Sequence, residues 1–183
     1  MRIAVVLVLL GLAGTAHADE RAWRLGAAGV SRFDPSGDGG FGLALQALRQ
    51  RDDNAFGVLF EHTWLRPADD SPELGIRQLD VLAVARLGSP VSLELAAGLA
   101  VYHGRVDIPE EPGCFGCGKY DGSSVAPIGR LGVVWSHELG KGIAIEIGAR
   151  VVGTRVVITV TDRHNFNPQP VTFQGSVGFS RAL

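Results

Sequence analysis

The sequence has little of several features that would otherwise define its class. It contains two cysteines in 183 residues, too few for a scaffold built on disulfides. It has no run of 18 or more apolar residues, which excludes a membrane-spanning helix. A formal net charge of −2 excludes nucleic-acid binding through a basic face, and 46% hydrophobic residues exclude a disordered chain. Lysine is also scarce, with Lys119 and Lys141 among 17 basic residues, whereas a soluble surface normally carries more.

The first residues have the pattern of a bacterial export signal. Arg2 precedes an apolar stretch over residues 3–12, and Ala16-His17-Ala18 forms a small-x-small cleavage site. The apolar stretch is too short to span a membrane, and no cysteine follows it for lipid attachment. We therefore expect a signal peptide at 1–18 and one mature domain at 19–183, exported to an oxidising compartment.

Hydrophobic side chains alternate with polar or small ones along most of the mature chain, which is the period of a β-strand. In the clearest case, every odd position from Val91 to Val101 is apolar. Eight such segments occur in series, and no convincing helical period is present. The predicted strands are 21–33, 41–48, 55–65, 76–87, 91–106, 125–137, 143–160 and 171–183.

The predicted connections alternate in length. The long ones are 34–40, 66–75, 107–124 and 161–170, and the short ones are 49–54, 88–90 and 138–142. Long loops therefore lie at one end of the sheet, and short turns and both termini lie at the other. An even number of strands with short turns on the terminal side is typical of a bacterial outer-membrane barrel.

The two faces of the predicted strands indicate which side is outside. The apolar face is too bulky for the interior of an eight-stranded barrel, which has just enough room for side chains. Turned outward, it forms a lipid-facing band with aromatic residues at both ends. These are Trp23, Phe56, Trp135 and Phe179 near the turns, and Phe33, Phe41, Trp64 and Phe173 near the loops. The sequence therefore predicts an all-β fold, an eight-stranded antiparallel up-and-down transmembrane β-barrel.

The opposite face is expected to place a network of charges in the lumen. We predict a lower layer of Arg24, Arg86, Glu94 and Glu146 and an upper layer of Glu61, Asp80, Arg130 and Arg150. Each layer is neutral, so arginine–carboxylate pairs can form within it. A polar conduction path is one interpretation, but a lumen closed by side chains fits such a narrow barrel better. The individual pairs depend on the strand shear, which the sequence does not give.

These features resemble the small eight-stranded outer-membrane barrels of the OmpA/OmpX type. The resemblance covers 19–183 and rests on the leader, the eight strands, the loop alternation and a strand ending at the last residue. In that family the last strand ends in an aromatic residue that the barrel-assembly machinery reads. Here Phe179 lies on the lipid face, but Arg181 interrupts that face and Leu183 is the final residue.

The resemblance implies an outer-membrane location, contact with outer-membrane lipid and engagement of the barrel-assembly machinery during biogenesis. It implies no nucleic-acid partner. We expect no cell-wall-binding domain of the kind found in larger OmpA relatives, because the eighth strand reaches the end of the chain. The oligomeric state is left open.

Cys114 and Cys117 form a Cys-x-x-Cys pair in the predicted loop 107–124. A small local disulfide is the favoured interpretation for an exported loop. A metal site is a second interpretation, with His103 and His164 expected at the same end of the barrel. A redox pair is a third, although the thioredoxin-like βαβ setting is missing.

The four long loops carry ten acidic and three basic residues, a net of −7, which predicts an acidic rim. Such a rim could collect divalent cations or a basic partner, or simply be solvated. No catalytic constellation, metal set or cofactor motif is apparent. Ser136-His137 is a weak signal at the turn end, and His62 beside Trp64 suits a membrane interface.

We therefore expect a non-enzymatic outer-membrane barrel of the cell envelope, with a structural or surface-interaction role through its loops. Two alternatives stay open at this point. One is a soluble periplasmic barrel of lipocalin type that binds an apolar ligand. The other is a barrel enzyme that modifies lipid A.

Overall fold

The computed structural model describes residues 23–33, 39–66, 74–108, 118–155, 158–161, 164–166 and 170–183. The predicted signal peptide at 1–18 lies outside the described residues, as do Cys114 and Cys117. Those two predictions therefore stay predictions. No helix long and apolar enough to cross a membrane occurs among the described residues.

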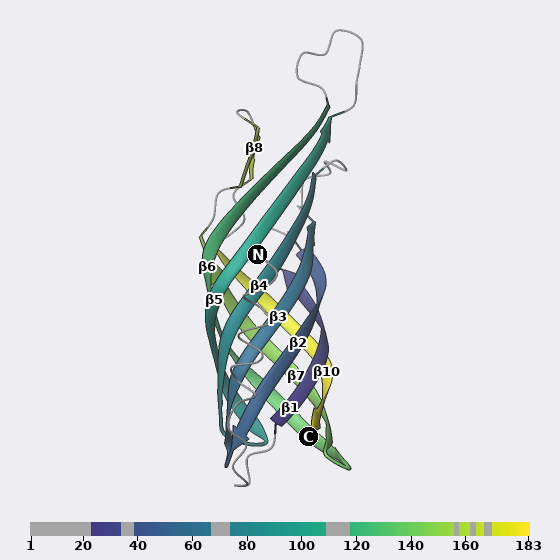
Figure 1. Cartoon of the computed structure of the whole chain (residues 1–183), viewed down its shortest axis with the longest axis vertical. Coiled ribbons are helices and arrows are strands. Elements are labelled where there is room, and N and C mark those ends of the chain that lie inside the picture. The colour runs from purple at the N-terminus through teal and green to yellow at the C-terminus, as the bar shows by residue number, and fades with distance from the viewer. Residues whose placement is uncertain are drawn as a thin grey trace.

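Eight long strands form a closed barrel (Figure 1). All neighbouring strands pair antiparallel, and β1 pairs with β10 to complete the ring. The strands are β1 (Trp23–Phe33), β2 (Gly39–Arg51), β3 (Asn54–Arg66), β4 (Leu74–Leu87), β5 (Val91–Ile108), β6 (Gly118–Gly140), β7 (Ile143–Thr154) and β10 (Val171–Ala182). The prediction of an eight-stranded antiparallel up-and-down barrel is confirmed.

Two predicted boundaries were wrong by more than three residues. The seventh strand was predicted to run over 143–160, but β7 ends at Thr154, and the chain then forms a separate two-stranded sheet of β8 (Ile158–Thr161) and β9 (His164–Phe166). Alternation continues into β8 because β8 is also extended, and alternation does not say which sheet a strand joins. The sixth strand was predicted to begin at 125, but β6 begins at Gly118, where polar and glycine residues had indicated a loop.

The strands are staggered around the barrel. Cross-strand partners can be followed from β1 through every barrel strand and back to β1. The path runs Trp23, Arg49, Phe56, Ala85, Leu95, Leu131, Val151, Phe173 and Phe33. It returns ten residues further along β1, so the shear is ten. Residues that are level along the barrel axis therefore come from very different register rows.

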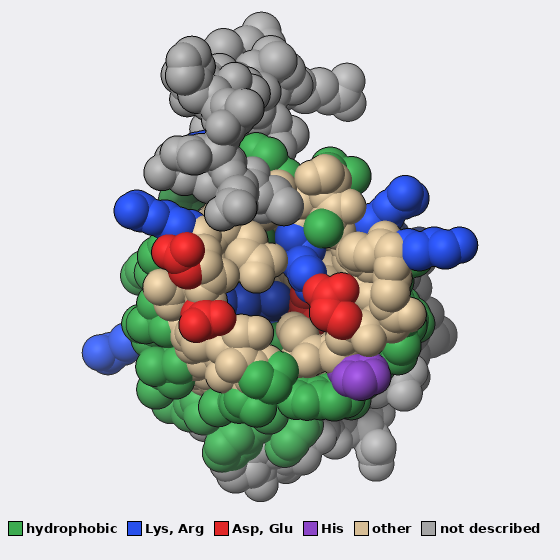
Figure 2. Space-filling view, turned by 90° about the horizontal axis from the view of Figure 1, so that it is seen from below, with side chains coloured by type: hydrophobic (Ala, Val, Ile, Leu, Met, Phe, Trp, Pro, Cys, Tyr) green, Lys and Arg blue, Asp and Glu red, His purple; other side chains and the backbone are tan. Residues whose placement is uncertain are grey.

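The apolar faces of the strands point outward. Leu95 on β5 and Leu131 on β6 are direct partners, and their side chains are 44% and 52% exposed. The view from the turn end shows hydrophobic side chains around the outside, acidic and some basic side chains toward the middle, and other Lys or Arg side chains projecting from the rim (Figure 2). This arrangement is the reverse of a lipocalin, whose interior is apolar, and so it disfavours the soluble-barrel alternative.

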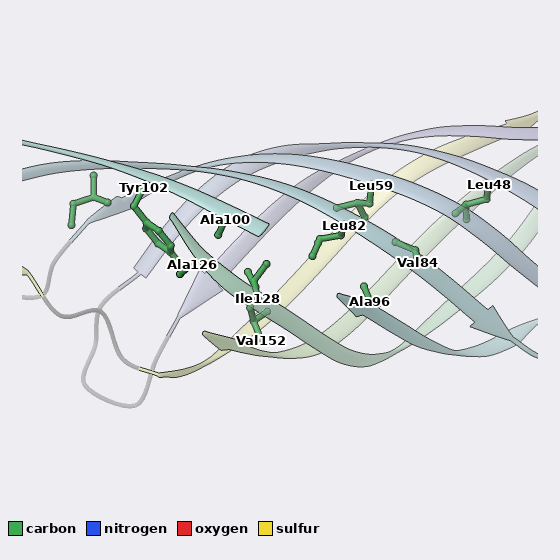
Figure 3. Close-up of a cluster of buried hydrophobic side chains, with 11 residues drawn as sticks. Leu48, Leu59, Leu82, Val84, Ala96, Ala100, Tyr102, Ala126, Ile128 and Val152 are labelled. Atoms are coloured by element: carbon green, nitrogen blue, oxygen red, sulfur yellow. The ribbon is translucent and has the colours of Figure 1, made fainter. Parts of the chain in front are cut away.

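The interior also contains apolar side chains between its polar groups. They include Leu48, Leu59, Leu82 and Tyr102, which are almost fully buried. Figure 3 shows this cluster along the inner face, from Leu48 at one end to Tyr102 at the other. Inward glycines let strands approach closely. At Gly98, for example, an added Cβ would lie 2.0 Å from the carbonyl oxygen of Val81.

Candidate functional site: the charged lumen

Four charged side chains form an upper cluster, defined as Arg32, Glu61, Asp80 and Arg130. The Nη1 atom of Arg130 lies 2.6 Å from Oε2 of Glu61, and its Nη2 contacts Asp80. The Nη2 atom of Arg32 reaches the same two carboxylates, at 2.8 Å from Glu61 and 3.1 Å from Asp80. All four side chains are buried. Two arginines therefore bridge two acids in a closed, neutral group.

The register explains why two arginines are needed in the upper cluster. Glu61 on β3 and Asp80 on β4 are direct cross-strand partners, so their like charges face each other. Neutral side chains complete the group. The amide nitrogen of Gln174 donates to Glu61 at 2.6 Å, and that of Gln78 donates to Asp80 at 2.7 Å. The carboxylate oxygens thus accept hydrogen bonds from side chains on β1, β4, β6 and β10.

A second group forms the lower cluster, defined as Arg86, Glu94, Glu146 and Arg150. Arg86 and Glu94 are cross-strand partners on β4 and β5, and the Nε atom of Arg86 lies 2.8 Å from Oε2 of Glu94. The Nη1 atom of Arg86 lies 2.8 Å from Oε2 of Glu146. Arg150 donates to both oxygens of Glu94. This cluster is also neutral, and Glu94 joins its two arginines.

Gln46 connects β2 to the lower cluster. Its oxygen accepts a 2.7 Å hydrogen bond from Arg86, and its nitrogen donates a 2.7 Å bond to Glu146. Arg150 also donates to the hydroxyl of Ser176 on β10 at 2.6 Å. Side chains from five strands thus meet at this level, so the cluster ties together strands that are not neighbours in the sheet.

A small cavity of about 20 Å³ adjoins both clusters, with Arg130, Glu146 and Arg150 among its lining residues. This volume is of the order that one water molecule needs. Arg130 Nε and Glu146 Oε1 are buried without a hydrogen-bond partner, so the lining has polar capacity for such a water. The described interior is therefore a packed plug of ion pairs and apolar side chains.

The structure brings together seven of the eight charges predicted for the lumen. Arg150 belongs to the lower cluster and not to the upper layer where the sequence placed it. Arg24 is in neither cluster, since it pairs with the half-exposed Glu138 at the turn end. The shear causes both differences, because residue counts from the strand ends do not give axial levels in a staggered barrel. Arg32 was missed, although its position between outward Ser31 and Phe33 marks it as inward.

The turn end has an open cavity of about 240 Å³, lined in part by Arg24, Ser92, Ser136 and Glu138. His137 also borders this cavity, but its exposed ring stacks on Trp135 on the outer face of β6, with 5.6 Å between ring centroids. Because Ser136 and His137 are adjacent on β6, their side chains lie on opposite faces of the sheet. The sequence pair is therefore not a nucleophile–base pair.

At the loop end, the structure brings together a serine, a histidine and an aspartate that the sequence analysis did not connect. The Nδ1 atom of His103 lies 3.0 Å from the hydroxyl of Ser123, and its Nε2 lies 3.8 Å from Asp121. The second distance is too long for a hydrogen bond, so the carboxylate does not orient the imidazole as in a catalytic triad. No group of three or more potential metal ligands occurs among the described residues.

The predicted aromatic girdle at the loop end forms two stacked pairs on the outer surface. Phe33 stacks on Phe173 with 5.8 Å between centroids, and Phe41 stacks on Trp64 at 5.4 Å. The His62 ring lies 4.3 Å from the Trp64 ring. Aromatic side chains at this position suit a membrane interface.

No protein-family model matches the sequence, and no curated protein is significantly similar to it. Solved structures do match. Neisserial surface protein A is 18% identical with a TM-score of 0.53, over 90% of this chain and 98% of that protein. A major outer-membrane protein of Thermus thermophilus is 11% identical with a TM-score of 0.66, over 90% and 100%. Ail of Yersinia pestis is 14% identical with a TM-score of 0.52, over 89% and 97%. The chain therefore has the fold of the small bacterial outer-membrane β-barrels.

Proposed function

We propose that the protein is an integral outer-membrane barrel without enzymatic activity, which closes its own lumen and presents its loop end to the outside. The observation that carries this proposal is the distribution of charge. Four acids and four arginines are paired inside the barrel, while the outer surface between its two ends is apolar. An apolar outer surface around a charged interior would be unfavourable in water. In a lipid bilayer the same distribution is required, because the outer surface contacts acyl chains and the charges must be paired inside.

The height of the apolar band supports this placement. On β5 the outward side chains are apolar from Val91 to Val101, and the next outward residue is His103. Roughly 11 residues at about 3.3 Å each, tilted by about 40°, span about 28 Å along the barrel axis. The apolar band of outer-membrane barrels is about 25 Å tall. The band therefore fits one bilayer core.

The β5–β6 hairpin supports a surface-interaction role. Its strands stay paired from Val101–Val125 up to Ile108–Gly118, whereas pairing of β6 with β7 begins only at Ile128. The hairpin therefore extends past the barrel wall at the loop end (Figure 1). We place the partner-binding surface on this extension. A Cys114–Cys117 disulfide in the connection between its two strands would restrict the tip.

Epitope insertion tests which end faces outside. A tag inserted between Cys117 and Gly118 is expected to be labelled by antibody on intact cells. The matched control is a tag in the β6–β7 turn at Lys141, which should be labelled only after the outer membrane is opened. Labelling of the Lys141 tag alone on intact cells would reverse the orientation and overturn the proposal.

A lipid A profile tests the absence of enzymatic activity. Mass spectra of lipid A from cells with and without the protein are expected to be identical in acyl-chain number and phosphate content. A new or missing acylated species that depends on the protein would show a lipid-modifying barrel instead.

A further inference from the structure

A cross-strand row runs over β3 to β6 directly above the apolar outward residues of β4 and β5. Trp64 on β3 pairs with Arg77 on β4, Arg77 with His103 on β5, and His103 with Ser123 on β6. All four point outward, and below them the outward side chains of β4 and β5 are apolar. On β4 and β5, Arg77 and His103 therefore lie where the acyl chains of a bilayer end and the headgroups begin.

Two arginines on this border are free. Arg77 and Arg105 are exposed, and among the described residues neither has a hydrogen bond or an ion pair. In contrast, the inward Arg86, Arg130 and Arg150 each contact at least one buried carboxylate. Lone arginines at the edge of an apolar surface have a ready anionic partner in lipid headgroups.

The spacing of the two arginines suits one shared anion. Arg77 is the direct partner of His103, and Arg105 lies two residues further on the same face of β5. Diagonal neighbours of this kind are about 7–8 Å apart, within reach of long side chains. Guanidinium groups bind phosphate oxygens in a bidentate manner. Asp121 is the direct cross-strand partner of Arg105 and lies 3.8 Å from His103, but within the described part of the chain no ion pair joins it to either arginine.

We propose that Arg77, His103 and Arg105 form a binding site for the phosphate groups of lipid A in the outer leaflet. The arginines hold the phosphate, and the Ser123 hydroxyl, 3.0 Å from His103, offers a further donor at the same edge. Trp64, beside Arg77, packs against the upper acyl chains. We assign the phosphate to lipid A because the loop end faces the leaflet that consists of lipopolysaccharide. The site thus rests on the orientation proposed above.

Native mass spectrometry of the detergent-folded barrel tests the site, with diphosphoryl lipid A as the probe. The Arg77→Gln/Arg105→Gln variant is expected to bind lipid A about 10- to 100-fold more weakly than the unaltered protein, because two charge-assisted contacts are lost. The matched control, Arg51→Gln/Lys141→Asn, removes two exposed cations at the turn end and should change the affinity less than about twofold.

Three further probes separate the possible sources of the phosphate. Lipid A without its phosphates should bind the unaltered protein as weakly as diphosphoryl lipid A binds the double variant. Inorganic phosphate should not displace lipid A, and phosphatidylglycerol should bind both proteins equally. Equal lipid A binding by the unaltered protein and the double variant would overturn the site. An arginine-dependent preference for phosphatidylglycerol would overturn the assignment to lipid A.

Heat-modifiable migration on gels keeps this test distinct from the barrel proposal. Each protein must migrate as a folded barrel before heating. If the unaltered protein lacks a heat-modifiable form, the membrane-barrel proposal fails. If it folds and its lipid A affinity does not depend on Arg77 and Arg105, the lipid site alone fails.

Discussion

Replacing Glu94 by glutamine is expected to lower the free energy of unfolding by about 3–5 kcal/mol. Glu94 is 1% exposed and accepts hydrogen bonds from both Arg86 and Arg150. Glutamine keeps the shape but removes the negative charge, so the lower cluster is left with two buried guanidinium groups and one carboxylate. Denaturant titration of the barrel folded in detergent or lipid measures the change.

The exposed ion pair at the turn end supplies the control for Glu94. Glu138 pairs with Arg24, but its side chain is 55% exposed, so Glu138→Gln should cost no more than about 1 kcal/mol. A second variant, Glu94→Gln with Arg150→Gln, restores neutrality to the lower cluster and should recover part of the loss. Equal, small effects at Glu94 and Glu138 would show that the lower cluster is solvated, contrary to the packed lumen.

Introducing arginine at Leu131 is expected to destabilise the folded barrel by about 2–4 kcal/mol. Leu131 is 52% exposed, so the same change on a soluble protein would bring the charge into water at little cost. It lies midway along the outward apolar residues of β6, between Val125 and Trp135, and therefore at the centre of the band. Reversible unfolding from lipid vesicles measures the cost.

The control for Leu131 is an outward leucine at the edge of the band. Leu87 is the last residue of β4, next to a short turn, and is 41% exposed. Leu87→Arg should cost about 0–1 kcal/mol, because near the interface the charge reaches headgroups and water. Equal costs at the two positions would indicate that the outer surface does not contact lipid.

Alternation was enough to predict the barrel and the face of each side chain. Val91 to Val101 alternates so regularly that a one-residue slip would expose Glu94 to lipid, so the pattern itself fixes which face is inward. The same rule applies to Arg32, whose inward position follows from Ser31 and Phe33. The alternation therefore already contains the signal that Arg32 belongs to the charged lumen.

The partners of the lumen charges could not be predicted, because they depend on the shear. Arg150 meets Glu94, which is on a strand two positions away in the sheet, and this contact exists only at a particular stagger of the strands. Turn lengths do not give that stagger. Strand ends were hard to predict for another reason: residues 118–124 have loop composition, and β5 nevertheless holds them in a hairpin by backbone hydrogen bonds.

Nuclear Overhauser contacts between leucine methyl groups and lipid acyl chains test the central claim most directly. In lipid nanodiscs, the methyl groups of Leu95 and Leu131 should show strong contacts to acyl-chain protons, while those of the buried Leu59 and Leu82 should show none. Acyl-chain contacts at Leu59 and Leu82, with water contacts at Leu95 and Leu131, would contradict the account. They would show that the apolar outer face does not contact lipid and that the interior is not closed by paired charges.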